Sequence, residues 1–539
     1  MENAYSTILD RLFAQPTILE QDSKPVEDLT GRDRLVSNVI FSWAAHFVFI
    51  VAGFIMPRMI DRRLGQDLLG VWDFAWSLVS YFGLVQAGVG SSVNRYVAKH
   101  RAAGDISGMN RIVSSASCIL CVAGLIVLAL TIALSLMLPQ LFGAKLGQNV
   151  FDAQWVVFFL GASLVIEMSF SAFSGVLTGC HRWGLHNFIK SGWHVITIAG
   201  MIVALLKDGG LLSLAVINFA GQLLENTTRV IIAHRVCEGL RVRPSLVGWA
   251  TIRKLFVFGG KTLIPSVSNL LLNQTTSILI VFYLGPAALA LYARPCSLVN
   301  HINTLVSKMA FTLTPTVSSL QSTENQKEIR ELLITSVRYS FYMVLPIVLV
   351  LVVFGDAVMQ LWMGRRYANG FLPAILAVGY LATLVQVPAL TVLAGLNAHG
   401  RAGIAQFIAS VCSAGLTILG LWYLKLGIVE TAVAVTLPLT VMNVIYLPYL
   451  ICRRVNLDVR QYFLSVTAGP LVHVLPFAIC LVVARLIFQT QPLLGLVLGG
   501  SVGGAILAIL YWRYVLPDRI KCCVLSYVHG RAGPSAVTD

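Results

Sequence analysis

The sequence predicts an all-α polytopic membrane protein with about fourteen transmembrane helices, and its composition and apolar patterning lead to this fold class. Of the 539 residues, 57% are apolar and only 12% are charged. A water-soluble chain would carry about twice that charged fraction, and one of this length would divide into domains joined by polar linkers. Apolar runs of about 18 or more residues, each able to cross a hydrocarbon core of roughly 30 Å, instead recur to the end of the chain.

Each apolar run predicts one span. The spans cover residues 35–57, 70–90, 112–138, 153–179, 188–206, 210–234, 255–283, 286–316, 333–354, 371–396, 403–424, 426–451, 463–488 and 493–515. Very short connections separate spans 5 and 6, 7 and 8, and 11 and 12, so twelve or thirteen spans are alternatives. Residues 1–34 mix charges of both signs without an apolar segment, which predicts an N-terminal tail rather than a signal peptide. Residues 516–539 form the corresponding C-terminal tail.

The basic residues predict which ends of the spans face the cytoplasm. Lysine and arginine are roughly twice as frequent in one set of alternate loops, and the positive-inside rule assigns this richer set to the cytoplasm. The richer set contains Arg95, Lys99, Arg101, Arg111, Arg182, Lys190, Arg235, Arg241, Arg243, Arg253, Lys254, Lys327, Arg330, Arg401, Arg453, Arg454 and Arg460. Both termini are then cytoplasmic, which agrees with an even number of spans. Basic loops beside an anionic leaflet explain most of the formal charge of +15, so no nucleic acid partner is expected.

Two segments of the chain match at an offset of 220 residues. Residues 63–79 read RLGQDLLGVWDFAWSLV, and residues 283–299 read YLGPAALALYARPCSLV. Each segment closes one span and opens the next, and the two lie six spans apart. Because six is even, both halves have the same topology and are expected to be related by a pseudo-twofold axis along the membrane normal. Chance similarity between two apolar hairpins is the alternative.

The repeat divides the chain into predicted domains. We predict an N-lobe of spans 1–6 at residues 35–250 and a C-lobe of spans 7–12 at residues 251–452. Spans 13 and 14, at residues 453–515, lie outside the repeat. A cleft between two such lobes is where a transporter binds its substrate.

Charged side chains inside the spans are candidates for a functional site, because a charge at mid-bilayer costs at least roughly 2.5 kcal/mol. In span 8, polar residues recur at steps of three and four and so share one helical face. They are Arg294, Ser297, His301, Thr304 and Lys308. Span 7 carries a second stripe that includes Lys261, Asn269 and Asn273. The deep ionisable groups of both spans are basic, which favours a cavity for a phosphate or pyrophosphate; hydrogen bonding between helices is the alternative.

Acidic residues within three other spans are candidates for coupling to a proton or sodium ion: Asp73, Glu167 and Glu225. Glu225 lies four residues before Arg229, a spacing that favours a structural ion pair. His46, in span 1, is interpreted as an interior histidine with satisfied hydrogen bonds. Arg58, at the end of the same span, is interpreted as a side chain that snorkels to the membrane interface.

No motif of catalysis or of metal binding is present. The sequence contains no Walker motif, nucleophile elbow or metal-ligand spacing. Cys118 and Cys121 form a C-x-x-C in the middle of a span with no second pair, which does not indicate a metal or redox site. We therefore expect a protein that is not an enzyme and needs no cofactor; a membrane-embedded polymerase or transferase is the alternative.

The stretch from Pro57 to Asp105 resembles the N-terminal signature of bacterial polysaccharide flippases. It reads PRMIDRRLG and then GVWDFAWSLVSYFGLVQAGVGSSVNRYVAKHRAAGD. The span 8 segment LYARPCSLV, followed by PTVSSLQ, is similar to the opening of the second half in these proteins. The family comprises the O-antigen and exopolysaccharide flippases of the multidrug/oligosaccharidyl-lipid/polysaccharide (MOP) superfamily. Its motifs provide no catalytic residue that could be transferred to this chain.

The resemblance implies two six-helix lobes around a central cavity, with two extra helices at the C-terminus. It also implies a substrate, an oligosaccharide repeat unit on undecaprenyl pyrophosphate, that moves from the cytoplasmic to the periplasmic leaflet of the bacterial inner membrane. Polysaccharide polymerase and chain-length machinery are further partners that it suggests. Our hypothesis is alternating access, with Arg294, Lys308 and Lys261 holding the pyrophosphate. The main alternative is a cation-coupled multidrug antiporter of the same superfamily, which would depend on Glu167 or Asp73.

Overall fold

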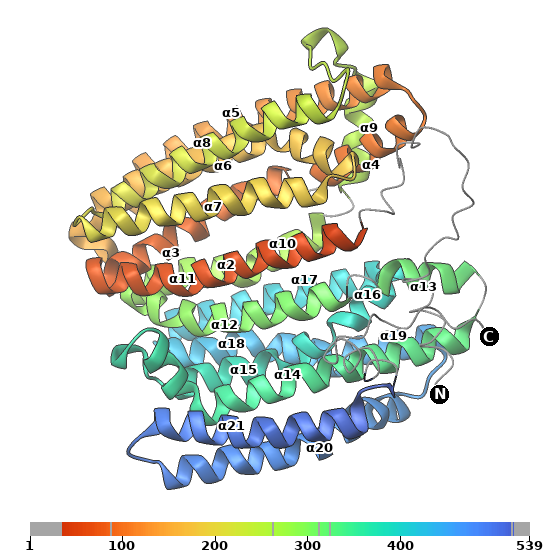
Figure 1. The fold of residues 1–539 in the computed structure, drawn as a ribbon. Helices are drawn as coiled ribbons and strands as arrows, with labels where there is room; N and C mark the ends of the chain where they lie inside the picture. The colour runs from red at the N-terminus through yellow and green to blue at the C-terminus, as the bar shows by residue number, and fades with distance from the viewer. Residues whose placement is uncertain are drawn as a thin grey trace, which may run out of the picture.

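The described residues form helices and connecting turns, with no strand among them (Figure 1). The computed structural model describes residues 35–86, 89–260, 263–310, 313–322, 325–518 and 521. Ten helical stretches in this part of the chain are long and apolar enough to cross a membrane, and one of them, Ile106–Gly179, contains two helices joined by a turn. The predicted all-α polytopic fold is therefore confirmed, while the count of fourteen spans stays a prediction.

The first helices correspond to the predicted N-lobe, with α5 to α8 in the upper part of Figure 1. They are α2 (Leu35–Leu64), α3 (Gln66–Ser80), the 3-10 turn η2 (Tyr81–Gln86), α4 (Val89–Ala102), α5 (Ile106–Leu146), η3 (Gly147–Asn149), α6 (Val150–Gly179), α7 (Trp183–Leu206) and α8 (Leu211–Val236). The turn η2 interrupts the second predicted span, and α4 continues beyond the expected end of that span at residue 90.

The short helices η4 (Pro244–Leu246) and α9 (Trp249–Gly260) lead to the predicted C-lobe. Its elements are α10 (Leu263–Leu270), the π turn η5 (Leu271–Thr275), α11 (Thr276–Leu284), α12 (Pro286–Ala310), α13 (Leu313–Ser322), α14 (Gln326–Trp362), η6 (Arg365–Tyr367), α15 (Phe371–Val385), α16 (Val387–Gly395), α17 (His399–Ile418), η7 (Leu419–Tyr423), α18 (Ile428–Val441), η8 (Met442–Tyr446) and α19 (Leu447–Val455). Two further helices pack on α14 at the bottom of Figure 1. They are α20 (Val459–Ile487) and α21 (Pro492–Leu510), and α21 continues into the π turn η9 (Tyr511–Val515).

Residues 255–260, which the sequence places at the beginning of span 7, lie in α9, and α9 packs on α4 and α5 of the N-lobe. Residues 261 and 262 lie outside the described residues, and the rest of the predicted span corresponds to α10, η5 and α11. The continuity of span 7 therefore stays a prediction.

The 220-residue repeat is visible in the turns of the backbone. Gly65, between α2 and α3, has φ 96° and ψ 169°, and Gly285, between α11 and α12, has φ 94° and ψ 171°. Glycine suits these positions because it alone adopts such a positive φ without steric cost. At a later turn, Asp105 caps α5 and Asn325 caps α14, and each side chain accepts a hydrogen bond from the backbone N–H three residues further on.

The repeat extends to helix packing. A Cβ added to Gly179, at the end of α6, would lie 2.8 and 2.9 Å from two atoms of Val97 on α4. A Cβ added to Gly395, at the end of α16, would lie 2.8 and 2.9 Å from two atoms of Val317 on α13. Val97 and Val317 are themselves 220 residues apart. Equivalent helix contacts thus recur in the two halves of the chain, while the division into two lobes and their boundaries stay predictions.

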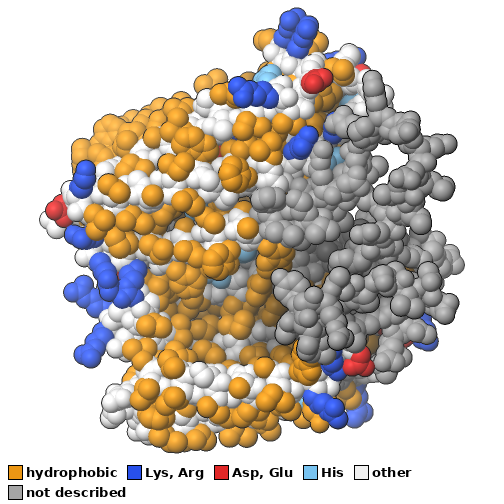
Figure 2. All heavy atoms as spheres, viewed as in Figure 1, with side chains coloured by type: hydrophobic (Ala, Val, Ile, Leu, Met, Phe, Trp, Pro, Cys, Tyr) orange, Lys and Arg blue, Asp and Glu red, His pale blue; other side chains and the backbone are white. Residues whose placement is uncertain are grey.

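The surface has an apolar belt between two polar ends. We name these ends by the predicted orientation: the inner end carries the turns at Asp105 and Asn325, and the outer end carries those at Gly65 and Gly285. In Figure 2, apolar side chains cover the middle of the visible face, and Lys and Arg lie toward the two ends. Leu125, Val472 and Ile487 are among the many large apolar side chains that are exposed in this belt, as expected for contact with lipid.

The two lobes approach most closely where α3 meets α12. Gly70 of α3 lies directly against the backbone of Pro286, the first residue of α12, and a Cβ at position 70 would overlap the Pro286 carbonyl group. Nearby, the Gln66 side chain donates a hydrogen bond to the Ala287 carbonyl oxygen at 2.9 Å. Because Pro286 contributes backbone atoms, it cannot move aside as a flexible side chain would.

We expect Gly70→Val to destabilise the protein by about 1–3 kcal/mol, the usual cost of overpacking. Thermal unfolding of the purified protein in detergent would show this as a Tm lowered by several degrees. Gly143→Ala is the matched control, because nothing lies within 4 Å of a Cβ at that helical position. Equal Tm values for the two variants would contradict the close contact between α3 and α12.

Candidate functional site

The sequence predicts that Arg294, on the polar face of α12, helps to hold an anion, and the structure shows that this side chain has a partner within the protein. The Arg294 guanidinium forms an ion pair with the Asp73 carboxylate of α3, across the boundary between the lobes. The Arg294 side chain is buried with 6% of its surface exposed, and the Asp73 side chain is mostly covered with 17% exposed. The spacing of residues along one helix does not indicate this partner, because Asp73 lies on another helix, about 220 positions earlier in the chain.

This pairing also changes the interpretation of Asp73 as an ion-coupling residue. Its carboxylate is committed to Arg294, and a buried ion pair that loses one partner leaves an uncompensated charge. Arg294 and Asp73 lie only a few turns from the outer turns at Gly285 and Gly65. The pair therefore holds the lobes together in the outer half of the bundle.

Deeper along the same face, His301 and Lys308 are turned toward α2. The His301 ring stacks on Phe54 with 5.4 Å between ring centroids, and its Nε2 would lie 3.5 Å from a Cβ at Gly53. Lys308 and His301 both interact electrostatically with His46 of α2. At 1.5 Å per residue, Lys308 lies roughly 21 Å further inward than Arg294. We call His46, His301 and Lys308 the basic cluster.

Two nitrogens of the basic cluster are buried without a hydrogen-bond partner among the described residues. They are the Nε2 atoms of His46 and His301. His46 was interpreted from the sequence as a satisfied interior histidine, and its free Nε2 contradicts that interpretation. A buried polar atom without a partner costs about 1–3 kcal/mol, so this arrangement suits a ligand or water that supplies the missing bond.

The predicted stripe on span 7 is placed only in part. Lys261 lies outside the described residues. Asn273 donates a hydrogen bond from its side chain to the Asn269 carbonyl oxygen at 3.1 Å, and Asn269 itself is exposed. Asn273 lies in the π turn η5, and a π turn within a helix is frequent at functional sites. Asn269 is exposed and Asn273 is half-buried, and their role as lining residues stays a prediction.

The 220-residue repeat relates the two boundaries between the lobes. Tyr81, at the start of η2, and His301 occupy equivalent positions. Tyr81 forms a hydrogen bond with Thr275 of η5 and so joins α3 to α11 across one boundary. His301 faces α2 across the other boundary with its Nε2 unpartnered. No described residue therefore bonds the His301 Nε2 atom at the boundary between α2 and α12, whereas Tyr81 links the other boundary.

Further polar contacts close the lobes at the outer end. The Arg58 guanidinium donates to the carbonyl oxygens of Leu361 and Trp362. In turn the Trp362 indole N–H donates to the Phe54 carbonyl oxygen at 2.7 Å, and the Tyr367 hydroxyl donates to the Asp61 carboxylate at 2.6 Å. Arg58 was interpreted as a snorkelling side chain, whereas it binds the C-lobe backbone more than 300 residues away in the sequence.

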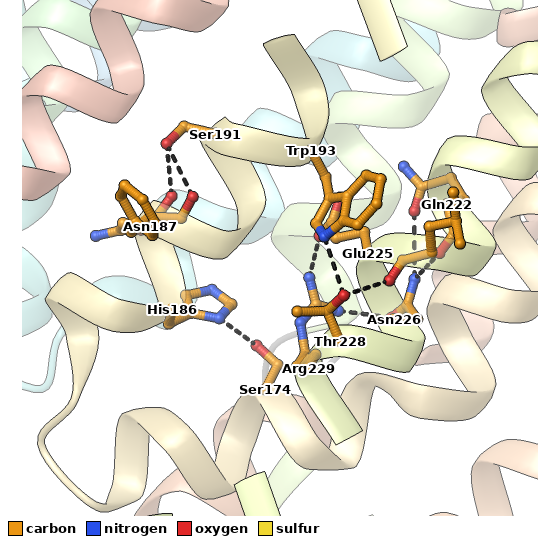
Figure 3. Close-up of polar contacts among 12 residues, drawn as sticks. Ser174, His186, Asn187, Ser191, Trp193, Gln222, Glu225, Asn226, Thr228 and Arg229 are labelled. Atoms are coloured by element: carbon orange, nitrogen blue, oxygen red, sulfur yellow. Dashed lines mark hydrogen bonds and ion pairs between the residues drawn. The ribbon is translucent and has the colours of Figure 1, made fainter. Parts of the chain in front are cut away.

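A second buried polar group lies inside the N-lobe, among α6, α7 and α8 (Figure 3). The Glu225–Arg229 ion pair predicted from the sequence is confirmed, and both side chains are buried. Arg229 also donates to the Asn226 side-chain oxygen at 2.7 Å, and Trp193 donates to the Thr228 hydroxyl at 3.0 Å. These contacts hold Glu225, Asn226, Thr228 and Arg229 in place within the lobe.

Glu167 of α6 has a different environment from the other two acidic candidates. It interacts electrostatically with Glu225, but no described basic residue forms an ion pair with it. Lys190 of α7 acts on the same Glu225 carboxylate. Of the three predicted ion-coupling residues, Asp73 and Glu225 each form an ion pair with an arginine, and Glu167 forms none among the described residues.

The sequence is similar to proteins of polysaccharide export. Residues 110–371 match the model of a family described as "Polysaccharide biosynthesis protein". A relative from Shigella flexneri, described as "Putative O-antigen transporter", is 21% identical over 402 residues, which cover 72% of this chain and 92% of the relative. These relatives are transport and biosynthesis proteins of polysaccharides, in agreement with the resemblance and with the expectation that the chain is not an enzyme.

Solved structures of the MOP superfamily have the same fold. An inward-facing multidrug resistance MATE transporter superposes with a TM-score of 0.66 at 14% identity, covering 77% of this chain and 95% of its own. The lipid II flippase MurJ in an inward closed conformation also superposes with a TM-score of 0.66, at 13% identity. The match covers 89% of this chain and 100% of the MurJ chain. An outward-facing MATE transporter superposes with a TM-score of 0.56 at 13% identity, and the match covers 82% of this chain and 100% of the transporter. These likenesses show that the chain shares the fold of these transporters.

Loss of one partner of the Asp73–Arg294 pair is expected to destabilise the protein strongly. We expect Arg294→Ala to cost roughly 3–5 kcal/mol, because it leaves a buried carboxylate alone. The double variant Asp73→Leu/Arg294→Met replaces both charges by apolar side chains and should recover most of that loss. Thermal unfolding of the purified variants would measure both effects. A stable single Arg294→Ala variant would instead favour the original hypothesis that Arg294 serves a ligand.

Proposed function

Because the sequence and the fold support a polysaccharide-flippase-type member of the MOP superfamily, we propose that this chain is a flippase for lipid-linked oligosaccharides. Its substrate would be a repeat unit on undecaprenyl pyrophosphate, carried from the cytoplasmic to the periplasmic leaflet of the bacterial inner membrane. The bilayer holds the lipid tail throughout, and the polysaccharide polymerase would receive the product.

The observation that carries the proposal is the basic cluster. Lys308 supplies a cation, and the unpartnered Nε2 atoms of His46 and His301 supply positions for hydrogen bonds. Pyrophosphate offers the matching negative charge and acceptor oxygens. The cluster takes over the role that the sequence suggested for Arg294, whose charge is neutralised by Asp73. The asparagines of span 7 would meet sugar hydroxyls.

The boundary between α2 and α12 is the path that we propose for the lipid. A pyrophosphate and a sugar cannot cross hydrocarbon unpaired, because each polar group there would be left without a partner. The head group would therefore enter between the lobes at the basic cluster, while the tail extends past α2 and α12 into the bilayer. The opposite boundary is joined by Tyr81 and Thr275, which makes it the less suitable path.

Alternating access supplies the movement. The outer end is closed by the contacts of Arg58, Tyr367 and the Asp73–Arg294 pair, so the conformation described here would receive substrate from the inner end. Release to the periplasm requires these contacts to separate. The irregular turns η2 and η5 lie in the middle of their helices, where such turns often mark hinges.

Glu167 is the residue that we propose for ion coupling, since Asp73 and Glu225 are held by arginines. This same residue would serve the alternative function, a cation-coupled multidrug antiporter, whose fold the chain shares. An antiporter of organic cations would need acidic groups where the basic cluster lies, and that difference favours the flippase.

Removal of the basic cluster is expected to abolish transport. In a deletion strain, His301→Ala/Lys308→Ala should restore surface polysaccharide to less than about a tenth of the wild-type level, with lipid-linked repeat units accumulating on the cytoplasmic face. Arg365→Ala/Arg366→Ala, at the exposed outer end, is the charge control and should complement fully. Lys308→Arg should retain activity. Normal polymer with altered drug tolerance would move the protein to the antiporter class.

Linking the lobes at the outer end is expected to stop transport reversibly. In a cysteine-free background, we would join Gln66→Cys to Ala287→Cys with a short cleavable cross-linker, because these positions face each other between the lobes. Ser135→Cys with Gln154→Cys joins α5 to α6 within one lobe, where the native side chains bond each other's backbone. Flipping in vesicles should cease only with the first pair and return on cleavage. Undiminished flipping would contradict opening at this end.

A further inference from the structure

A groove at the inner end of the N-lobe lies outside the proposed translocation path. It has a volume of about 700 Å³ and is formed by the ends of α4 and α5 and by α9. Its lining includes Tyr96, His100, Asp105, Arg111, Arg253 and Lys254. These helices belong to the N-lobe and to the connection toward α10, so the groove is separate from the α2–α12 boundary.

The charge of this groove is positive. Arg111, Arg253 and Lys254 contribute three permanent cations. The single carboxylate, Asp105, is already engaged, since it accepts a hydrogen bond from the Gly108 N–H at 2.7 Å and pairs with the His100 ring at 2.9 Å. The Gly108 hydrogen bond, followed by that of His100, lowers the pKa of Asp105 below its usual range. Asp105 therefore caps α5 and pairs with His100, and the Arg111 charge also acts on it; the three cations still outnumber this one carboxylate in the lining.

The helix α9 has the pattern of a helix that lies in a membrane interface. Leu255 is fully buried against the N-lobe, whereas Trp249 and Val257 are 78% and 64% exposed. Arg253 and Lys254 are exposed between these two apolar residues. The ammonium group of Lys254 also lies 5.2 Å from the centre of the Tyr96 ring, which fixes it over the groove. Such a combination of Trp, an apolar residue and adjacent cations is typical of an interfacial anchor.

We propose that this groove binds the phosphate head group of an anionic phospholipid of the inner leaflet. Arg111 and Arg253 hold the phosphate, Lys254 adds a third positive charge, and Trp249 and Val257 contact the acyl region beside it. The exposed apolar residues favour a lipid over a phosphate in solution, because a soluble anion would gain nothing from them. The bound lipid ties α9, and with it the connection between the lobes, to the membrane surface.

Lipid retention by the purified full-length protein tests the proposal without any transport step. Native mass spectrometry would measure binding of phosphatidylglycerol against phosphatidylcholine. The test variant is Arg111→Gln/Arg253→Gln/Lys254→Gln. The matched control, Arg62→Gln/Arg365→Gln/Arg366→Gln, removes three exposed cations from the outer end instead. Arg111→Lys/Arg253→Lys keeps the charge, so it separates loss of charge from loss of structure.

Each basic side chain near an anionic lipid surface contributes roughly a fivefold gain in affinity. We therefore expect the test variant to lose phosphatidylglycerol binding by a factor of ten or more, while the control and the lysine variant retain it. Equal losses in test and control variants would overturn the proposal, as would equal binding of the two lipids by the wild type. The proposal would also be overturned if the test variant kept its lipid binding but lost binding of inorganic pyrophosphate, because the groove would then bind a soluble anion. Because flipping is not measured, failure here leaves the proposed function untouched.

Discussion

Asp73 and Arg294 meet across the boundary between the lobes, in the interior of the bundle, and the arrangement of the rest depends on this pair. Each charge would be very costly there without the other. Their contact requires α3 and α12 to lie close together, which in turn requires Gly70, since any side chain at that position would overlap Pro286. The contacts of Arg58 and Tyr367 then extend the closure to the outer end.

The pairing of Arg294 with Asp73 at the outer end affects the role of the basic cluster further inward. Asp73 neutralises Arg294, so among the described residues the proposed anion site consists of Lys308 and the two histidines of the basic cluster. Closure and substrate binding are thus assigned to different turns of the same helix, α12. A movement that separates Arg294 from Asp73 would also shift Lys308, which gives a direct physical route from binding to opening.

The two lobes share a fold but not a charge distribution. The positions equivalent to Asp73 and Arg294 in the 220-residue repeat are Ala293 and Phe74, so the ion pair forms once and has no symmetric copy. In the same way Tyr81 closes one boundary through Thr275, while its equivalent, His301, leaves the other without a polar link. The repeat supplies two similar halves, and substitutions at equivalent positions make one boundary different from the other.

The sequence by itself determined the polytopic fold, the repeat and the Glu225–Arg229 pair. These depend on local properties: apolar runs of membrane length, glycines at turns of positive φ, and residues four apart on one helix. Only the tertiary structure decided that Arg294 is neutralised, that Arg58 binds the C-lobe and that His46 belongs to the basic cluster. The packing of α9 on the N-lobe likewise became clear only from the structure. The reason is physical: periodicity shows which side chains share a face of one helix, whereas the partner of that face comes from a helix hundreds of residues away.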